Sequence, residues 1–408
     1  MNEFRMNYNV HNGIRTSPAQ KASFDNLSKL ANRVNGIAIL LDSAPRNWMG
    51  QQEIHLRLCR ILTSLGIRVV LVYAGELPSE LDQRLRESGA EIEIVRYGKA
   101  RYNYYRELGR IIRQYSISMV HVCYFDYFSL IPWLTRLQGL RCIIYEELNS
   151  GMMKATSWKK QLLRLRTFVT SIPMTRVIAV SEFVKQDLIK RGFAAERIDV
   201  RYLAADEEKF KPDPGARQRW AAEYAIQPDE LIMSSVTLLR PFKCPETLVD
   251  ACGILAKRGI RAHLFVAGDG DMLPDLKARS HRLGVADRIH WLGFCADPAD
   301  LMQASDIFLL ASVAEAGAFV LSEAMLCGVP VIGSRSGVIS EYVEEGQTGL
   351  LAEPQNPASF ADAIEKLAKD KRLRLSMGRA SREVALEKFT IDIHVQNTLR
   401  IYESLCTN

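Results

Sequence analysis

Short apolar runs alternate with amphipathic segments along most of this chain, and this alternation limits the folds open to it. The run GIAILLD (36–42) precedes QQEIHLRLCRILTSLG (51–66), whose apolar residues recur at helical spacing, and RVVLVYAG (68–75) follows. A strand, a helix and a second strand in this order form a βαβ unit, because parallel strands need a long crossover connection. Further apolar runs occupy residues 92–97, 119–124, 141–147 and 175–181. The pattern predicts an α/β fold with a parallel sheet covered on both faces.

A second series of the same kind follows the charged, proline-bearing stretch EEKFKPDPGARQRW (207–220). Its apolar runs occupy residues 231–237, 262–268, 289–293, 307–312 and 328–333. A chain of 408 residues is long for a single hydrophobic core. We therefore expect two facing Rossmann-like domains. The expected boundaries are a flexible extension at 1–34, a first domain at 35–212 to which a C-terminal helix (390–408) returns, and a second domain at 213–389.

The composition, with 48% hydrophobic and 25% charged residues, is that of a folded globular protein. The longest apolar run, IFLLASVA (307–314), is too short to cross a bilayer, and the N-terminus lacks the apolar core of a signal peptide. The eight cysteines include no C-x-x-C pair, which favours free thiols in a reducing cytoplasm. A net charge of +6 suits a phosphate-bearing ligand or an anionic membrane surface, and no nucleic-acid partner is expected.

Two glutamates interrupt the small, apolar stretch SVAEAGAFVLSEAMLCGVPVIG (312–333). Glu315 falls in the loop after a strand, and Glu323 falls in the second turn of a helix that begins at about Phe319. A charge in apolar surroundings must be paired, neutralised or used on a ligand. Eight residues cover about 12 Å at helical rise, so one carboxylate could lie at each end of an elongated polar ligand. Alternatively, one glutamate is a surface residue and the other pairs with a basic neighbour.

Several motifs accompany this pair in a defined order. They are Glu315-x7-Glu323 with Gly328-Val-Pro-Val after it, Ser340-Glu341, Gly346-x-x-Gly349-Leu-Leu, Arg176-Val-Ile-Ala-Val-Ser181-Glu182, Val266-Ala-Gly268-Asp-Gly270 and the closing Phe389…Ile401-Tyr402. Over roughly residues 36 to 405 the chain resembles the retaining nucleotide-sugar glycosyltransferases of family 4. The resemblance implies a GT-B fold, in which a donor domain follows an acceptor domain.

The resemblance also implies roles for individual residues. Glu323 would accept hydrogen bonds from the ribose hydroxyls of the nucleotide, and Glu315 would face the transferred sugar. Lys243 would neutralise the diphosphate leaving group. Backbone N–H groups of Gly317, Ala318 and Phe319, at a helix N-terminus, would hold sugar or phosphate oxygens. Gly50 would lie in a Gly-rich loop after the first strand, where the missing side chain lets the phosphate approach, and Gly268 and Gly270 complete the implied donor-binding residues.

The sequence departs from the family pattern at several positions. Gln51 stands where the family has a second glycine, Leu238 where it has an arginine, and Cys244 where it has a glycine after the lysine. We expect Arg240, two positions beyond Leu238, to take over the phosphate contact, because arginine binds phosphate bidentately. Leu148 replaces a histidine near the acceptor and can exchange no proton.

The acceptor-side residues are therefore expected to be Glu146, Glu147 and Gln51. No metal or other cofactor is expected. Asp269-Gly-Asp271 resembles a metal-binding D-x-D pattern, but it follows a strand inside a G-x-G loop and is interpreted as a turn. The same loop is not G-x-G-x-x-G, which argues against a nicotinamide dehydrogenase.

Two stretches, KARYNYYRELGRIIRQY (99–115) and SWKKQLLRLRTFV (157–169), interleave basic residues with aromatic and aliphatic ones. Such a helix can lie on an anionic membrane, or it can pack on a sheet with its charges in water. Peripheral membrane contact of a cytoplasmic protein is thus one of two hypotheses.

The sequence predicts a retaining, metal-independent glycosyltransferase that uses a UDP-sugar, or secondly a GDP-sugar. The hydroxyl acceptor would be a glycan, a lipid-linked glycan or a small molecule, in bacterial glycan, polysaccharide or glycolipid synthesis. The alternatives are a nucleotide-sugar epimerase of the same fold and a degenerate protein that binds a nucleotide sugar or a partner without turnover.

Overall fold

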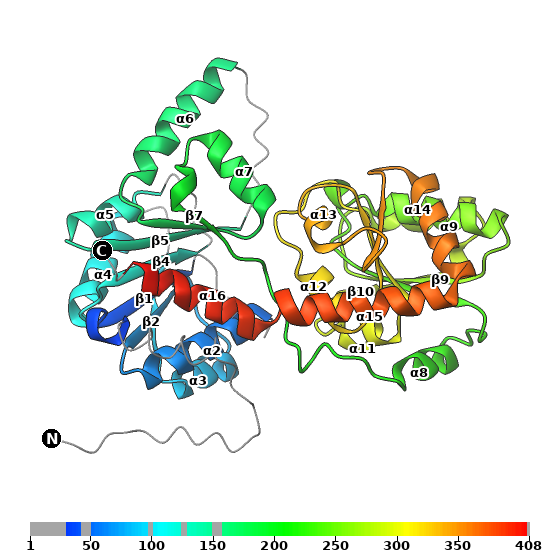
Figure 1. Ribbon diagram of the computed structural model, residues 1–408, viewed down its shortest axis with the longest axis horizontal. Coiled ribbons are helices and arrows are strands. Elements are labelled where there is room, and N and C mark those ends of the chain that lie inside the picture. Colours follow the sequence, from blue (N-terminus) through cyan, green and yellow to red (C-terminus); the bar gives the residue numbers. More distant parts are fainter. Residues whose placement is uncertain (1–29, 42–49, 97–100, 124–128, 149–156, 406–408) are drawn as a thin grey trace.

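The computed structural model describes residues 30–41, 50–96, 101–123, 129–148 and 157–405 of the chain. These residues form two α/β domains that lie side by side (Figure 1). Within the described residues, the first sheet has seven parallel strands in the order β3-β2-β1-β4-β5-β6-β7, and the second has six in the order β10-β9-β8-β11-β12-β13. The predicted fold of two Rossmann-like domains is confirmed.

The first sheet consists of β1 (Gly36–Leu41), β2 (Arg68–Tyr73), β3 (Glu91–Ile94), β4 (Met119–Cys123), β5 (Cys142–Glu147), β6 (Arg176–Ala179) and β7 (Ile198–Val200). Its helices are α2 (Gly50–Ser64), α3 (Ser79–Glu87), α4 (Arg101–Gln114), α5 (Ile131–Leu137), α6 (Ser157–Ser171) and α7 (Glu182–Arg191), with a short 3-10 turn η1 (Ala195–Arg197). The sequence pattern missed β7, because a strand of three residues is too short to show a period.

The second sheet consists of β8 (Leu231–Val236), β9 (Ala262–Ala267), β10 (Ile289–Gly293), β11 (Ile307–Leu310), β12 (Val331–Ser334) and β13 (Gly349–Ala352). Its helical elements are α8 (Ala216–Glu223), η2 (Pro241–Lys243), α9 (Pro245–Lys257), α10 (Leu273–Arg282), η3 (Ala286–Arg288), α11 (Ala299–Ala304), α12 (Phe319–Leu326), α13 (Ile339–Tyr342), α14 (Pro357–Lys369) and α15 (Lys371–Lys388). The last helix, α16 (Ile391–Ser404), belongs to the first domain. The predicted strand at 328–333 begins only at Val331, since Gly328 has a left-handed φ of 75° just after α12.

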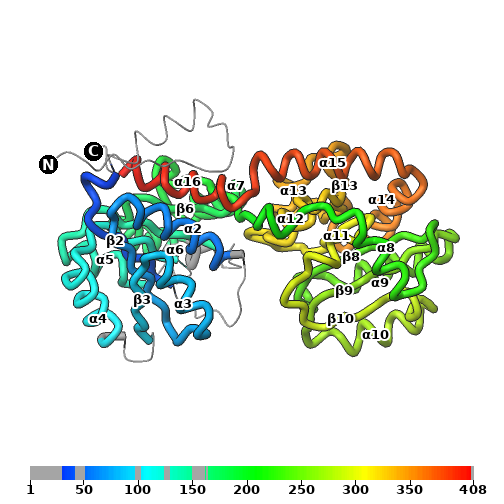
Figure 2. Tube along the Cα trace, turned by 90° about the horizontal axis from the view of Figure 1, so that it is seen from below, coloured from blue at the N-terminus to red at the C-terminus, as the bar shows by residue number. Residues whose placement is uncertain are grey.

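The chain crosses between the domains twice, and the two crossings lie side by side. The Ala205 N–H donates to the Phe389 carbonyl at 3.0 Å, and the Ile391 N–H donates to the Ala205 carbonyl at 3.2 Å. After the second crossing, α16 returns to the first domain and packs against α2, as Figure 2 shows. Thr390 caps α16 by accepting from the Ile393 N–H at 3.3 Å. The closely spaced crossings form a narrow connection between the two domains.

The described part of the chain begins inside the first domain. Leu30 and Val34 are buried in its core, although the sequence placed residues up to 34 in a flexible extension. Residues 1–29 lie outside the described residues, as does the loop at 42–49 that precedes Gly50. None of the described helices combines the length and apolar character that crossing a bilayer requires.

Candidate active site

A cleft of about 440 Å³ lies between the two domains. Gln51 and Glu53 of α2 line it from the first domain, and Asp206, Lys209 and Phe210 line it from the connection between the domains. The rest of the lining comes from the carboxyl ends of second-domain strands and the loops after them. Open α/β sheets bind ligands at this edge, and the volume is in the range of small-molecule sites.

Lys243 and Glu315 face each other in this cleft. Lys243 ends the short η2 turn after β8, and Glu315 lies in the loop after β11. Their Nζ and Oε1 atoms form an ion pair, and both side chains are largely buried. The pair compensates both charges, and an entering phosphate or sugar can compete for either group. One of the two hypotheses from the sequence was that a glutamate pairs with a basic neighbour. Glu315 does so in this structure, with Lys243 as its partner.

The residue after the lysine explains one departure from the family pattern. Cys244 has φ 48° and ψ 46°, a left-handed conformation that glycine adopts without strain. The thiol is buried and donates to the Pro241 carbonyl at 3.2 Å. A cysteine is thus accommodated at a position whose backbone favours glycine.

Glu323 lies on α12 and lines the same cleft. Burial raises the pKa of its carboxyl to about 7; Lys209 lowers this pKa and Asp297 raises it. These two neighbours form an ion pair of 3.1 Å with each other. Within the described part of the chain, no hydrogen bond or ion pair is seen on the Glu323 carboxylate. A carboxyl with a raised pKa that has no partner among the described residues, at the wall of a cleft, can accept hydrogen bonds from a ligand.

The turn from β11 into α12 brings backbone donors to the cleft. Gly317, Ala318 and Phe319 line it, and the α12 N-terminus has no side-chain cap. A Cβ atom on Gly317 would lie 2.3 Å from the Leu203 side chain, so this loop packs directly on the connection between the domains. Uncapped N–H groups at a helix N-terminus suit an anionic oxygen.

The predicted glycines after β9 are required by backbone packing. A Cβ on Gly268, whose φ is 147°, would lie 1.8 Å from the Thr237 carbonyl oxygen, and one on Gly270 would lie 2.4 Å from that of Leu239. Asp269 accepts the Gly270 N–H at 2.8 Å, which agrees with its interpretation as a turn residue. Gly268 and Asp269 line the cleft, whereas Gly270 does not.

Several predicted residues lie outside the cleft lining. Arg240 precedes η2 and is exposed, but it does not line the cleft. Gly50 is the first residue of α2, directly before Gln51. Glu146 and Glu147 on β5 are buried, and Glu147 accepts from the Tyr145 hydroxyl at 3.3 Å.

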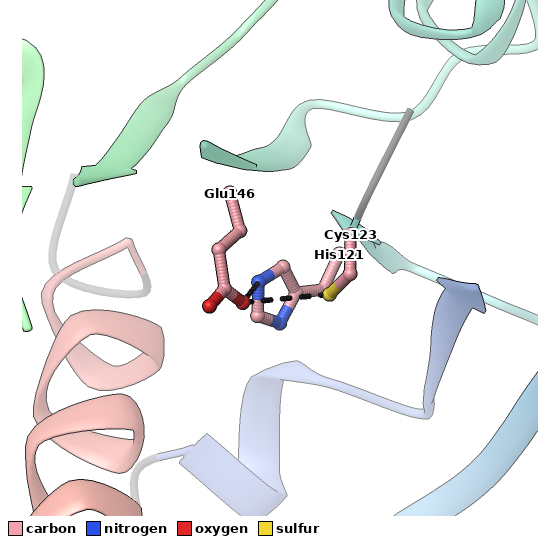
Figure 3. A group of neighbouring side chains, drawn as sticks. All are labelled: His121, Cys123 and Glu146. Atoms are coloured by element: carbon pink, nitrogen blue, oxygen red, sulfur yellow. Dashed lines mark hydrogen bonds and ion pairs between the residues drawn. The ribbon is translucent and has the colours of Figure 1, made fainter. Parts of the chain in front are cut away.

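Glu146 belongs to a buried polar cluster of the first domain, in which it lies next to His121 and Cys123 (Figure 3). Its Oε1 pairs with the Arg201 guanidinium, while Oε2 lies 3.2 Å from His121 Nε2 and accepts from Cys123 Sγ at 3.5 Å. The Tyr402 hydroxyl of α16 lies 2.8 Å from His121 Nδ1. Burial alone would raise the pKa of Glu146, but Arg201 and His121 hold that pKa well below its usual range.

Among the described residues, His121, Cys123 and Glu146 are the group that could hold a metal ion, since one ligand atom of each lies within 4.8 Å of the others. The Arg201 charge already balances Glu146 and opposes an added cation. Burial also raises the pKa of the Cys123 thiol, which disfavours the thiolate that a metal requires. We interpret the cluster as a charge-balanced network that attaches α16 and the connection between the domains to the first sheet.

Among the cleft residues that sequence reasoning missed are Asp206, Lys209 and Phe294. Asp206 directly precedes the charged linker (207–220) and Lys209 lies in it, and the composition of that linker was interpreted only as a boundary. Phe294 is 70% exposed and lines the cleft, where a planar ligand group can pack on its ring. A lone aromatic after a strand gives no local signal that it faces a ligand.

Family models match most of the chain. Residues 49–209 match the model described as Glycosyltransferase Family 4, and residues 216–384 match Glycosyl transferases group 1. The two matches coincide closely with the two observed domains.

Individual relatives agree with these matches. The N-acetyl-alpha-D-glucosaminyl L-malate synthase of Bacillus anthracis is 27% identical over 326 residues, which cover 76% of this chain and 82% of that protein. A GDP-mannose-dependent alpha-(1-6)-phosphatidylinositol monomannoside mannosyltransferase of Mycobacterium tuberculosis is 32% identical over 216 residues, 51% of this chain and 56% of that one. This chain thus spans little more than half of the second relative.

Solved structures show the same architecture. Anabaena HepE in complex with UDP superposes with a TM-score of 0.77 at 20% identity, over 90% of this chain and 100% of HepE. A glycosyltransferase from Rickettsia africae gives the same TM-score and identity over 92% of this chain and all of that one. With the family matches, these findings show that this chain is a glycosyltransferase of family 4 and that it has the GT-B fold.

Proposed function

We propose that this glycosyltransferase moves a sugar from a nucleoside diphosphate to a hydroxyl acceptor with retention of the anomeric configuration and without a metal ion. The donor is a UDP-sugar, with a GDP-sugar as the second choice. The acceptor is a glycan, a lipid-linked glycan or a small molecule. The observation that carries this proposal is the arrangement of one cleft, in which Lys243 and Glu315 face each other and the unpartnered carboxyl of Glu323 lines the same wall.

The donor orientation follows from the chemistry of these groups. The Glu323 carboxylate accepts hydrogen bonds from the two ribose hydroxyls, and the exposed ring of Phe294 packs on the base. The diphosphate then lies toward Lys243 and the uncapped N–H groups of α12, with Glu315 facing the sugar. Arg240 remains a predicted phosphate contact, which it reaches only if its exposed side chain turns into the cleft.

In the proposed reaction, the bond between the anomeric carbon and the diphosphate oxygen breaks. The acceptor oxygen forms a bond to the same face of that carbon, and its proton passes to the departing diphosphate oxygen. Lys243 stabilises the charge that grows on the diphosphate as it leaves. Its ammonium supplies the cation that a metal provides in other sugar transferases, and Asp269 is engaged in its own turn.

Two findings support the nucleotide classes. The HepE structures contain UDP, and the mycobacterial relative is named for GDP-mannose. Both statements concern those proteins, and the nucleotide panel below measures which base this chain binds.

A thermal-shift panel of UDP, GDP, ADP and TDP tests the proposal on wild type, Glu323→Ala and the control Glu344→Ala. Glu344 is a glutamate of the same domain, and it pairs with Lys388 away from the cleft lining. A ligand at a hundred times its dissociation constant adds about 2.7 kcal/mol of stability. We expect UDP to raise the melting temperature of wild type and the control but not of Glu323→Ala. If UDP raised the melting temperature of all three proteins equally, Glu323 would not contact the nucleotide.

Product analysis then separates the alternatives. Incubation with the matching nucleotide sugar and an acceptor mixture should yield an α-linked product from an α-linked donor. A changed sugar on the nucleotide, formed without acceptor, would indicate an epimerase. Binding without any product from the full acceptor set would favour a degenerate binding protein.

A further inference from the structure

Exposed apolar side chains gather on one corner of the first domain. Within the described residues, six of the twelve exposed large apolar side chains belong to α5, α6 and the residues directly beside them. They form what we call the α5–α6 face: Leu130, Leu137, Leu165, Phe168, Val169 and Ile172. The Trp133 indole N–H donates to the Val169 carbonyl at 3.1 Å, which joins the two helices. Figure 1 shows α6 extending beyond the body of the domain.

The stripe on α6 has the spacing of a buried helix face. Leu165, Phe168, Val169 and Ile172 recur at intervals of three and four residues, so they share one side of the helix. These side chains are between 44% and 60% exposed, although such a stripe normally faces a core. An apolar face of this kind indicates an interaction site.

The charges around the face have one sign. Every charged residue of α5 and α6 is basic, and those whose side chains the structure describes are Arg136, Arg164 and Arg166. The acidic residues between 130 and 172 are Glu146 and Glu147, and both are buried. A basic helix with an exposed apolar stripe fits an anionic lipid surface, because the side chains enter the interface while the cations meet the headgroups.

The other basic amphipathic stretch of the sequence behaves differently. On α4 the apolar residues Leu108, Ile111 and Ile112 are buried against the sheet. Arg110 of that helix pairs with Glu93 and with Glu107. The apolar side of α4 thus packs on the sheet, whereas the apolar stripe of α6 is exposed.

We propose that the α5–α6 face docks on an anionic membrane. The occupant is a lipid bilayer, with the aromatic and aliphatic side chains at the acyl boundary and the arginines among the phosphates. The proposal concerns a surface of the first domain and does not depend on which nucleotide or sugar enters the cleft. It would bring the enzyme to a surface at which lipid-borne hydroxyl acceptors are concentrated.

Vesicle co-sedimentation of the full chain tests this at low salt. The vesicles are phosphatidylcholine alone, or phosphatidylcholine with one third phosphatidylglycerol. We expect binding to the anionic vesicles, which falls as salt is raised, and weak binding to the neutral ones. The double change Leu165→Gln and Phe168→Gln should lower the partition coefficient at least about tenfold, since each side chain loses its apolar burial.

The matched control is Leu375→Gln with Leu386→Gln on α15, which removes two exposed leucines from the other domain. It should leave vesicle binding unchanged. Substitution of exposed side chains should preserve the fold, which the circular dichroism spectrum and the ligand-free melting temperature of each variant verify in the absence of lipid.

Three outcomes would overturn the proposal. Wild type that stays in solution with anionic vesicles excludes docking. Equal binding of wild type and the α6 variant places the contact elsewhere. Sedimentation equilibrium without lipid could show that wild type is a dimer and the α6 variant a monomer. The α5–α6 face would then bind a second copy of the chain. A failure of nucleotide binding, by contrast, affects only the proposed function.

Discussion

The titration of Glu323 provides a quantitative test of the donor site. Its pKa is raised from 4.5 to about 7, chiefly by burial. The folded protein therefore holds the proton more tightly than the unfolded chain does. This contributes stability below pH 4.5, which is lost as the pH rises to about 7. The shift of 7 minus 4.5, or 2.5 units, corresponds to about 3 kcal/mol at 1.36 kcal/mol per unit.

Glu323→Gln removes the titration and keeps the shape of the side chain. Without ligand, the variant should be more stable than wild type at pH 8 by up to about 3 kcal/mol, and the difference should shrink toward pH 5. Urea unfolding at half-unit steps from pH 5 to 8 measures this directly. Glu344→Gln, at an ion-paired glutamate outside the cleft lining, is the control. Parallel curves for wild type and Glu323→Gln would refute the idea that burial raises the pKa of the Glu323 carboxyl.

Nucleotide binding should reverse the shift. Ribose hydroxyls donate to the ionised carboxylate and favour it, so the proton must leave when UDP binds. From a pKa of about 7, roughly three quarters of a proton should be released per UDP at pH 6.5. Calorimetry in two buffers of different ionisation enthalpy measures this number. Proton release that persists in Glu323→Gln would assign it to another group.

Three further predictions concern chemistry and stability. Lys243→Met should lower turnover by about 10² to 10³ in a product-formation assay while leaving UDP affinity within an order of magnitude, and equal turnover would exclude Lys243 from charge stabilisation. Arg201→Met leaves the buried Glu146 carboxylate without its arginine partner, so urea unfolding at pH 7 should show a loss of about 3–5 kcal/mol in the free energy of unfolding. The double change Arg201→Met with Glu146→Gln should recover part of this loss. Gly270→Ala places a Cβ 2.4 Å from the Leu239 carbonyl oxygen and should lower the melting temperature. In the control Gly284→Ala, the added Cβ meets no neighbour, but the backbone φ is 69°. This control should therefore lose only the backbone strain energy of about 1–2 kcal/mol.

The elements near the donor site could be predicted because their signals are local. The alternation of apolar runs and helical spacing located β8, β9, β11 and the start of α12 at Phe319 within a few residues. Glu315 therefore fell correctly in a loop and Glu323 in the second turn of a helix. A parallel sheet then brings strand ends to one edge, which is where the cleft lies.

The acceptor side could not be predicted in this way. Glu146 and Glu147 follow each other on β5, where alternate side chains point to opposite faces of a sheet that is covered on both sides. Whether such a carboxylate faces a ligand or a counter-ion depends on Arg201 and His121, which lie far from it in the sequence. The local pattern shows a charge in a strand and carries no information on its partner.

By itself, the sequence determined the two-domain α/β architecture and placed Glu315 in a loop and Glu323 in a helix, because strand and helix periods depend on neighbouring residues. Gly50, expected in a loop, begins α2. Only the tertiary structure decided which charges meet. It paired Lys243 with Glu315, left Glu323 without a partner, and placed the carboxylate of Glu341 against the Glu182 N–H of the other domain at 2.8 Å. It also buried the apolar face of α4 and exposed that of α6. The physical reason is that burial and charge compensation depend on contacts between distant segments, which exist only once the chain is folded.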